Sequence, residues 1–297
     1  MISRRAFITK NEDLSMRWRI TLDQVTSVGI RSLPDLKWRL TSSFPRSLDT
    51  IFAGADVFAS AIADMTDGRW RIEVFAANEI VPGLQALDAV SDGIVDACHT
   101  GSFYYVGKNL AFALGTAIPF GLNSRMQDAW LFAVGGQEKL NAFYRKYGVY
   151  ALPCGNTGCQ MGGWFRKEVN TPNDLKGLKF RIGGFAGQVL AKLGIVPQQI
   201  AAGDIYPALE KGAIDAAEWV GPYDDEKLGF YKVAPYYYYP GFWEGGTTLH
   251  LFINTRIWDE LPPIYQAIAR NAAHHAHTSV QARYDVLNPP ALRKLVA

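Results

Sequence analysis

The chain has 297 residues, of which 48% are apolar and 20% are charged, and its net charge at neutral pH is +2. This composition predicts one large or two medium folded domains and excludes a disordered chain. The small net charge gives no reason to expect binding to nucleic acid or to an anionic membrane. The sequence has no run of about 20 apolar residues, so no transmembrane helix is predicted.

The N-terminus carries a pair of arginines, Arg4 and Arg5, in a segment that looks like a twin-arginine export signature. Such signals continue with an apolar segment, whereas residues 11–20 here are polar and charged. We therefore expect residues 1–36 to be a divergent or defective export-signal region. The alternative is a chance arginine pair.

Strand and helix patterns alternate from Lys37 onward. The first series has strands at Trp38–Ser42, Arg71–Phe75 and Ile94–Cys98, and helices at Ser47–Met65 and Gly83–Asp92. The second has strands at Tyr150–Pro153, Leu178–Ile182, Ala213–Ala217 and Thr248–Asn254, and helices at Phe185–Leu193, Asp204–Glu210 (capped by Asp204) and Pro262 to about Leu287. This alternation predicts mainly parallel sheets with helices on both faces.

A short internal repeat predicts two similar lobes. Residues 208–216, ALEKGAIDA, match residues 89–97, AVSDGIVDA, at four of nine positions. Each copy is a helix end, a glycine and an apolar strand, followed by a loop rich in glycine and aromatic residues. In open α/β sheets, ligands bind beyond the carboxyl ends of the strands.

Arg181 lies at one such strand end, before Gly183 and Gly184. The planar fork of an arginine suits a carboxylate, and paired glycines would let a ligand approach the backbone. The alternative is a structural ion pair with a nearby acid.

Glu218 and Trp219 follow another strand. If Glu218 and Arg181 face one cleft, an anionic ligand meets one attractive and one repulsive charge. A hard cation held by Glu218 and by amide or carbonyl oxygens would resolve this conflict. The alternative is that Glu218 is solvated or paired with Arg181. Gln160 and Glu244 are further candidates. Gln160 lies in a glycine-rich segment, whose alternative interpretation is a crossover between lobes. Glu244 lies among aromatic residues and glycines.

Several other features favour no site. Three cysteines without metal-ligand spacing are expected to be small buried thiols: Cys98, Cys154 and Cys159. Of the histidines at 274, 275 and 277, only the first and last share a helix face, so a metal role is not favoured. The run Tyr236–Tyr239 is expected to be a packed or half-exposed segment rather than a site. No nucleotide-binding or nucleophile motif is found, so no catalytic residue is assigned.

Three segments carry a family resemblance: residues 155–194, 205–230 and 238–254. They resemble the substrate-binding proteins of tripartite ATP-independent periplasmic (TRAP) transporters, in the branch that binds 2-oxo acids such as pyruvate. The resemblance extends from about Trp38 to the C-terminus. Its specific feature is LKGLKFRI at 175–182 together with GAIDAAE at 212–218.

The resemblance implies an α/β, two-lobed periplasmic binding protein fold, with a mainly parallel sheet in each lobe and a long inter-lobe helix. Residues 37–158 with about 246–286 would form lobe I, and residues 159–245 with about 287–297 would form lobe II. It also implies a periplasmic protein that captures a small 2-oxo or 2-hydroxy carboxylate for TRAP membrane subunits.

The resemblance implies site residues as well. Arg181 would bind the substrate carboxylate. Sodium, with calcium as the alternative, would be held by Gln160, Glu218 and the Trp219 carbonyl, with Glu244 beside it. The remaining substrate contacts would come from Asn156, Tyr104, Tyr105 and Trp219, and the bulk of Trp219 and Trp243 would suit a small ligand.

The chain departs from this family in two places. It lacks the apolar export segment, and members of the branch continue beyond Ala297 with a helical segment that pairs protomers, so a homodimer receives less support. Two other functional classes stay open: a metal-dependent enzyme acting on a small oxo or hydroxy acid with Glu218 as base, and a sensor module.

Overall fold

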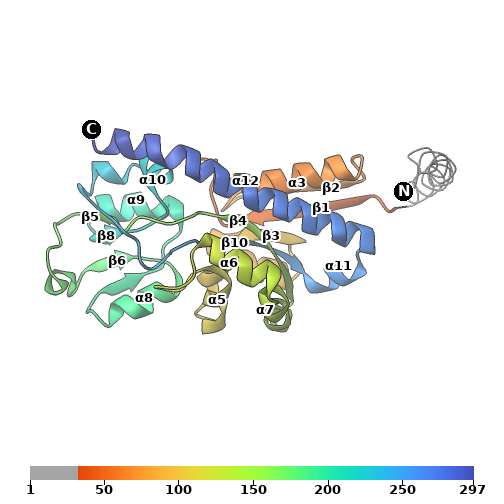
Figure 1. Cartoon of the computed structure of the whole chain (residues 1–297), viewed down its shortest axis with the longest axis horizontal. Helices are drawn as coiled ribbons and strands as arrows, with labels where there is room; N and C mark the ends of the chain where they lie inside the picture. The colour runs from red at the N-terminus through yellow and green to blue at the C-terminus, as the bar shows by residue number, and fades with distance from the viewer. Residues whose placement is uncertain (1–32) are drawn as a thin grey trace, which may run out of the picture.

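The computed structural model describes residues 33–297, which form two five-stranded sheets with flanking helices (Figure 1). The twin-arginine-like motif lies outside the described residues. We call the part that carries the first sheet lobe I and the part that carries the second lobe II.

The sheet of lobe I has the order β2-β1-β3-β10-β4. Strand β1 is parallel to β2 and β3, and β10 is antiparallel to β3 and β4. The strands are β1 Leu36–Ser42, β2 Trp70–Phe75, β3 Ala97–Thr100, β4 Val149–Asn156 and β10 Thr248–Asn254.

The sheet of lobe II has the order β7-β6-β8-β5-β9 and the same arrangement. Strand β6 is parallel to β7 and β8, and β5 is antiparallel to β8 and β9. The strands are β5 Gly163–Phe165, β6 Lys179–Arg181, β7 Val196–Gln198, β8 Ala216–Ala217 and β9 Tyr236–Tyr238. In each sheet the reversed strand is the first strand after the chain arrives from the other lobe. The prediction of two mainly parallel α/β sheets is confirmed.

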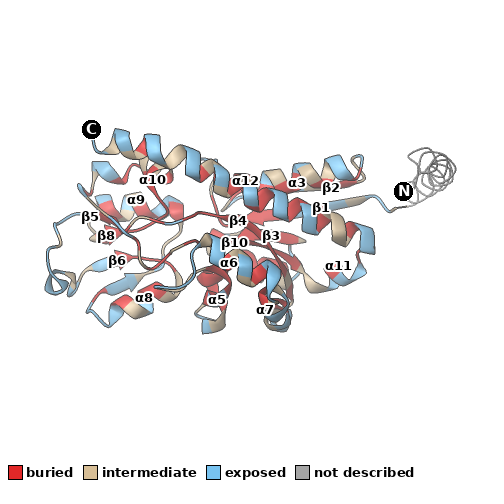
Figure 2. Ribbon diagram, viewed as in Figure 1, coloured by how far each residue is buried: buried red, intermediate tan, exposed pale blue. Residues whose placement is uncertain are grey.

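Helices cover both sheets, and their inner faces are buried (Figure 2). They are α3 Ala53–Met65, α4 Ala86–Ser91, α5 Ala113–Thr116, α6 Ser124–Asp128, α7 Gly136–Tyr144, α8 Gly184–Ala191, α9 Ala202–Glu210, α10 Pro222–Leu228, α11 Thr255–Glu260 and α12 Pro263–Leu295. Helix α12 packs against α3 and β4 of lobe I and against α10 of lobe II. It is therefore the long inter-lobe helix. None of the helices in the described range has the length and hydropathy of a membrane span.

Two segments cross between the lobes side by side, residues 157–162 and 239–247. The backbone amide of Thr157 donates to Thr247 O at 3.1 Å, and that of Gln160 donates to Glu244 O at 3.2 Å. A Cβ atom at Gly241 would lie 2.4 Å from the Met161 carbonyl oxygen, so this contact requires glycine. The paired crossing brings Gln160 and Glu244 together although they are far apart in sequence.

Some predicted element boundaries are wrong. Helix α3 begins at Ala53 rather than Ser47 because the preceding residues form turns. In these turns the Leu48 amide donates to the Pro45 carbonyl and the Phe52 amide donates to the Leu48 carbonyl. Asp204 lies in the first turn of α9, whose N-cap is Ala201, so it is not the cap.

Two strands and one helix also differ from their predicted lengths. Strands β3 and β8 begin only at Ala97 and Ala216, after loops that the apolar pattern concealed. Helix α12 continues past Leu287 to Leu295 because its buried side chains continue to Ala291.

Cys98 and Cys154 are buried, as predicted, whereas Cys159 is exposed, so the prediction of a buried thiol there is wrong. Cys159 lies on the crossing segment, where the backbone rather than the side chain makes the contacts. Its Sγ atom lies 3.8 Å from Gln160 O.

His250 on β10 is fully buried in lobe I, and neither of its ring nitrogens has a hydrogen-bond partner in the described part of the chain. Burial lowers the pKa of His250 to about 3, with smaller contributions from His277 and His99. The unfolded chain therefore binds a proton at this position below pH of about 6.5, while the folded chain excludes it.

We expect His250 to make the protein less stable as pH falls below about 6.5, by about 1.4 kcal/mol per pH unit. In the His250→Leu variant, the free energy of unfolding is expected to fall less steeply as pH is lowered. Urea unfolding between pH 6.5 and 4 measures this dependence on pH, with His275→Leu, at an exposed position of α12, as the control. The same dependence on pH in wild type and His250→Leu would contradict the expectation.

Candidate ligand site between the lobes

A small cavity lies between the lobes beside the crossing segments. The volume within it that the centre of a water molecule can occupy is about 20 Å³. This is room for about one water molecule. Its lining comes from both lobes: Phe44, Ile51, Phe103, Tyr104, Thr157, Gln160, Arg181, Glu218, Trp219, Val220, Glu244, Thr247 and Leu249. Apolar side chains of lobe I thus face polar groups of lobe II and the crossing segments.

Arg181 and Glu218 form a buried ion pair in this cavity. Strands β6 and β8 are parallel with Arg181 opposite Ala217, so Glu218 follows directly. Arg181 Nη1 lies 2.6 Å from Glu218 Oε1, and each side chain is only 2% exposed. The structure therefore brings these two predicted residues together, in the ion pair that the sequence left as the alternative.

Further contacts fix the pair. Arg181 Nε donates to Ile200 O at 3.0 Å, and Nη1 donates to Glu218 O at 2.6 Å. The amide of Gly183 donates to Glu218 Oε1 at 2.8 Å. The guanidinium carbon lies 4.8 Å from the centre of the Trp219 ring, a cation–π distance.

A buried ion pair adds little net stability compared with an apolar core. Burial raises the pKa of Glu218, and the opposing effects of Arg181 and the Gly183 amide are smaller. Burial, followed by the Glu218 charge, also raises the pKa of Glu244 to about 8. The cavity thus holds one buried ion pair with the Glu244 carboxyl group beside it.

Gln160 presents an unpaired oxygen in the same cavity. Its Nε2 donates to Thr157 Oγ1 at 3.0 Å and to Thr247 Oγ1 at 2.9 Å. Oε1 is buried and has no hydrogen-bond partner among residues 33–297. An unpaired buried acceptor costs about 1–3 kcal/mol, and amide oxygens are good ligands for hard cations.

Three of the other predicted site residues line the cavity. Tyr104 and Trp219 line it, and Glu244 accepts a hydrogen bond from Thr247 Oγ1. No backbone amide in the described range donates to the Trp219 carbonyl oxygen.

Three aromatic and amide side chains do not line the cavity. Tyr105 turns into lobe I, where its hydroxyl accepts from the Leu87 amide at 3.1 Å. Asn156 braces the start of the crossing segment by accepting from the Gly158 amide at 2.8 Å. Trp243 packs against Phe180 in the core of lobe II.

Gly183 and Gly184 receive a side chain of lobe I. Added Cβ atoms would lie 2.4 Å and 2.6 Å from the Phe103 ring, and Gly184 has a φ of +61°. In this structure Phe103, rather than a ligand, makes the close approach that was expected at these glycines. Phe103 was missed by sequence reasoning, as were the hydroxyls of Thr157 and Thr247 that orient Gln160.

Polar contacts also join the two lobes. Asp49 of lobe I pairs with Lys227 of α10 and accepts from the Tyr223 hydroxyl at 3.3 Å. We call Asp49, Tyr223 and Lys227 the latch. Farther along, Gln199 Nε2 donates to Tyr104 O at 2.8 Å.

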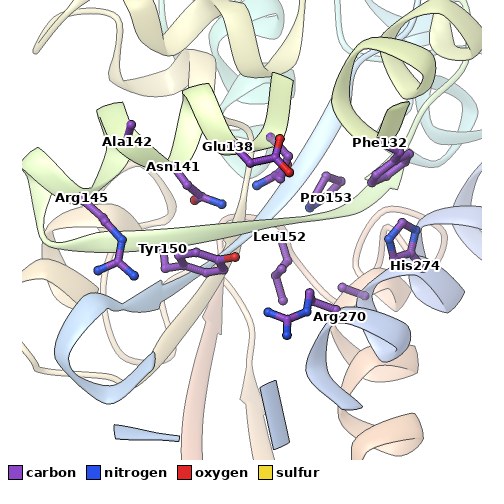
Figure 3. Close-up of a pocket in the computed structure, with 12 residues that line it drawn as sticks. Phe132, Glu138, Asn141, Ala142, Arg145, Tyr150, Leu152, Pro153, Arg270 and His274 are labelled. Atoms are coloured by element: carbon purple, nitrogen blue, oxygen red, sulfur yellow. The ribbon is translucent and has the colours of Figure 1, made fainter. Parts of the chain in front are cut away.

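A second, larger pocket of about 580 Å³ lies in lobe I between α7, β4 and α12 (Figure 3). Two of its polar side chains, Asn141 and Arg145, bond to other parts of the protein. Asn141 bonds both backbone groups of Ala151, and Arg145 pairs with Asp259. These contacts cover the edge of β4, so we do not assign the ligand site to this pocket.

The histidine cluster on α12 has structural contacts. His277 Nε2 lies 2.9 Å from Asp128 Oδ1, and its Nδ1 accepts from the Gly155 amide at 3.2 Å. His274 packs against Phe132. Within the described range, no group of three His, Cys, Asp or Glu side chains is placed to hold a metal ion.

Comparisons with known proteins identify the family. The family model "bacterial extracellular solute-binding protein, family 7" matches residues 41–297. The chain is 52% identical over 272 residues to the monocarboxylate 2-oxoacid-binding periplasmic protein of Nostoc sp., covering 92% of this chain and 74% of that protein.

Solved structures agree. A TRAP transporter solute-binding protein from Bordetella bronchiseptica, with calcium and picolinate, has a TM-score of 0.87 and 51% identity over 89% of this chain and 78% of that one. A TRAP periplasmic solute-binding protein from Pseudoalteromonas atlantica, with sodium and pyruvate, has a TM-score of 0.85 and 40% identity over 88% and 79%. The chain therefore belongs to family 7 of the bacterial extracellular solute-binding proteins, the family of TRAP transporter solute-binding proteins.

Proposed function

We propose that this protein captures a small 2-oxo monocarboxylate, such as pyruvate, together with a hard cation, for a TRAP transporter. The observation that carries the proposal is the buried Arg181–Glu218 pair with the unpaired Gln160 oxygen beside it. The similar Nostoc, Bordetella and Pseudoalteromonas proteins support the choice of ligand and cation.

The residues at the cavity fit a hard cation. Gln160 Oε1, the Glu218 carboxylate, the Trp219 carbonyl and Glu244 are all oxygen donors, which sodium and calcium prefer. When bound, such a cation supplies the positive charge that lets an anionic acid lie beside Glu218. Sodium is our first choice and calcium the second.

The chain's own residues do the rest. Arg181 turns its fork from Glu218 toward the ligand carboxylate, with the Trp219 ring supporting the guanidinium. Thr157 and Thr247 hold the Gln160 amide in one orientation. Phe103 covers Gly183 and Gly184 and excludes water, which strengthens each polar contact.

Lobe I, residues 37–158 with about 246–286, and lobe II, residues 159–245 with about 287–297, are the bodies that we expect to close on the ligand. The proposed location is the periplasm, and the proposed partners are the TRAP membrane subunits. A homodimer is a further candidate, because the Bordetella relative is described as a dimer. We propose binding without turnover.

A thermal-shift and calorimetry panel tests this function. Pyruvate, lactate and longer 2-oxo acids are each added with sodium, with calcium and with a chelator. We expect the unfolding temperature to rise most when acid and cation are both present, because ligand binding stabilises only the folded state. If proton NMR showed that pyruvate is converted to a product, that result would instead support the metal-dependent enzyme.

The latch is expected to slow ligand release. Asp49→Asn removes the charge that faces Lys227, and a partly exposed ion pair is worth about 0.2–1 kcal/mol. We expect pyruvate to dissociate a few-fold faster with little change in its association rate, measured by stopped-flow fluorescence. Asp64→Asn, at an exposed position of α3, is the control. An unchanged dissociation rate in Asp49→Asn would show that the latch does not contribute.

A further inference from the structure

The ring of Phe103 lies between the lobes and lines the ligand cavity. The short helix Ser102–Tyr105 of lobe I carries it, and the residue is buried. A Cβ atom at Gly101 would lie 2.9 Å from Cε1 of this ring, and one at Gly183 would lie 2.4 Å from Cε2, on the opposite edge. The ring is therefore bounded on both edges by backbone, one edge in each lobe. We call the space between Gly101 and Gly183 the ring slot.

The backbone conformation does not explain the two glycines of the ring slot. Gly101 has φ −90° and ψ 125°, and Gly183 has φ −80° and ψ 151°. Both are extended conformations that any residue adopts. For an added Cβ atom at either position, the three nearest atoms belong to the Phe103 ring. The closeness of this ring is therefore what favours glycine at both positions.

Buried hydrogen bonds fix the backbone that carries the ring. Ser102 Oγ donates to Phe112 O at 2.6 Å and lies 2.7 Å from Thr116 Oγ1. The Phe103 amide donates to the same Thr116 hydroxyl at 3.4 Å. Both hydroxyl side chains are fully buried. The ring can therefore neither slide within the slot nor move away from it while the lobes are closed.

The proposed binding mode leaves the carbon chain of the ligand on the side of this ring. In that mode Arg181 binds the carboxylate, and the cation beside Gln160 and Glu218 binds the 2-oxo oxygen. These polar groups belong to lobe II and the crossing segments, whereas lobe I contributes an apolar wall that includes Phe103. The chain beyond the 2-oxo carbon therefore packs against that wall.

We infer that Phe103 is a specificity-determining residue of the site and restricts the ligand to 2-oxo acids with short chains, such as pyruvate. The inference rests on the proposed function. A longer chain needs the place of the ring, which cannot turn aside because backbone bounds both of its edges. The lobes would then stay apart, because Phe103 could not enter the ring slot. In a hydrophobic pocket, one methylene group changes affinity by about 10- to 200-fold.

A series of acids with increasing chain length tests the wall. Calorimetry with sodium in excess compares pyruvate, 2-oxobutanoate and 2-oxohexanoate. We expect wild type to bind 2-oxohexanoate at least tenfold more weakly than pyruvate. Phe103→Ala removes the ring, so it should bind 2-oxohexanoate at least tenfold more tightly than wild type does. It should bind pyruvate a few-fold more weakly, because water enters the cavity.

Two further variants keep this test independent of damage to the fold. Phe103→Leu retains an apolar side chain and should lie between wild type and Phe103→Ala in its preference for chain length. Phe143→Ala is the matched control, since Phe143 is a partly buried phenylalanine of lobe I that packs on Phe112 outside the cavity. It is expected to keep the wild-type order of the three acids.

Small-angle X-ray scattering adds a measurement that a merely structural role of Phe103 would not change. At saturating concentrations, wild type should have a larger radius of gyration with 2-oxohexanoate than with pyruvate, because the longer acid holds the lobes apart. Phe103→Ala should have the same radius of gyration with both acids.

Gly183→Ala tests the ring slot from the other lobe. Alanine suits the extended backbone at this position and keeps the amide that donates to Glu218. The added methyl group meets the Phe103 ring, so we expect pyruvate to bind about tenfold more weakly. In the double variant Gly183→Ala with Phe103→Ala, the methyl group meets no ring. Pyruvate should then bind as it does to Phe103→Ala alone.

Different results separate this inference from the function on which it rests. If wild type binds pyruvate and 2-oxohexanoate within threefold of each other, or if Phe103→Ala changes both affinities by the same factor, the wall is wrong and the function stands. If Gly183→Ala binds pyruvate like wild type, or if its loss adds fully to that of Phe103→Ala, the ring slot is wrong. If no 2-oxo acid binds to wild type with sodium or calcium, the function and the inference both fail.

Discussion

Arg181→Lys is expected to weaken pyruvate binding by about 2–4 kcal/mol, or roughly thirty- to a thousandfold. A lysine keeps the positive charge but offers no planar fork for a carboxylate. It also cannot reproduce the bonds of Arg181 to Glu218 and to Ile200 O at once. Isothermal calorimetry with sodium in excess measures the effect, and the loss of affinity is expected to be larger for Arg181→Ala.

Two controls isolate the clamp from general damage to the fold. Arg166→Lys makes the same exchange at an exposed position next to β5 and is expected to bind like wild type. Circular dichroism of ligand-free Arg181→Lys checks that the variant is folded. Affinity within threefold of wild type in a folded Arg181→Lys would refute the carboxylate clamp.

Glu218→Gln is expected to abolish the dependence of acid binding on the cation. The variant keeps the size of the side chain but loses the charge that attracts a cation and repels an anion. Wild type should bind pyruvate at least tenfold more tightly with sodium or calcium than with a chelator. In Glu218→Gln the affinities in the two conditions should converge, and calorimetry with and without cation measures both.

The exchange also leaves Arg181 without its buried partner. A loss of stability of about 3 kcal/mol is therefore expected, as for other broken buried pairs, and urea unfolding gives its size. Glu210→Gln, at an exposed position of α9, should keep the wild-type cation dependence. A Glu218→Gln protein that still needs sodium would place the cation elsewhere.

The two lobes and several elements were predictable because their patterns are local. Apolar alternation and glycine stops located β1, β2 and β10, and the repeat at 89–97 and 208–216 indicated a second sheet. The proximity of Arg181 and Glu218 followed from parallel strands that end at one edge. Their direct ion pair was left open, because side-chain direction depends on packing that no local pattern contains.

Other parts of the candidate site had no signal in the sequence. Gln160 and Glu244 meet because two crossing segments pair their backbones, and Thr157 and Thr247 are single hydroxyl residues in unremarkable contexts. Phe103 fills the space at Gly183 and Gly184, a contact between segments that are distant in the chain.

The position of β10 determines the order in which the two sheets are completed during synthesis. All strands of the lobe II sheet lie between residues 163 and 238, so that sheet closes from one continuous stretch. In lobe I, β10 inserts between β3 and β4, which were made about a hundred residues or more earlier. A nascent chain that has not reached Asn254 therefore carries two open strand edges, the kind of surface that aggregates or recruits chaperones. The sheet of lobe I is therefore the later of the two to be completed, and truncation before β10 would leave that sheet unfinished.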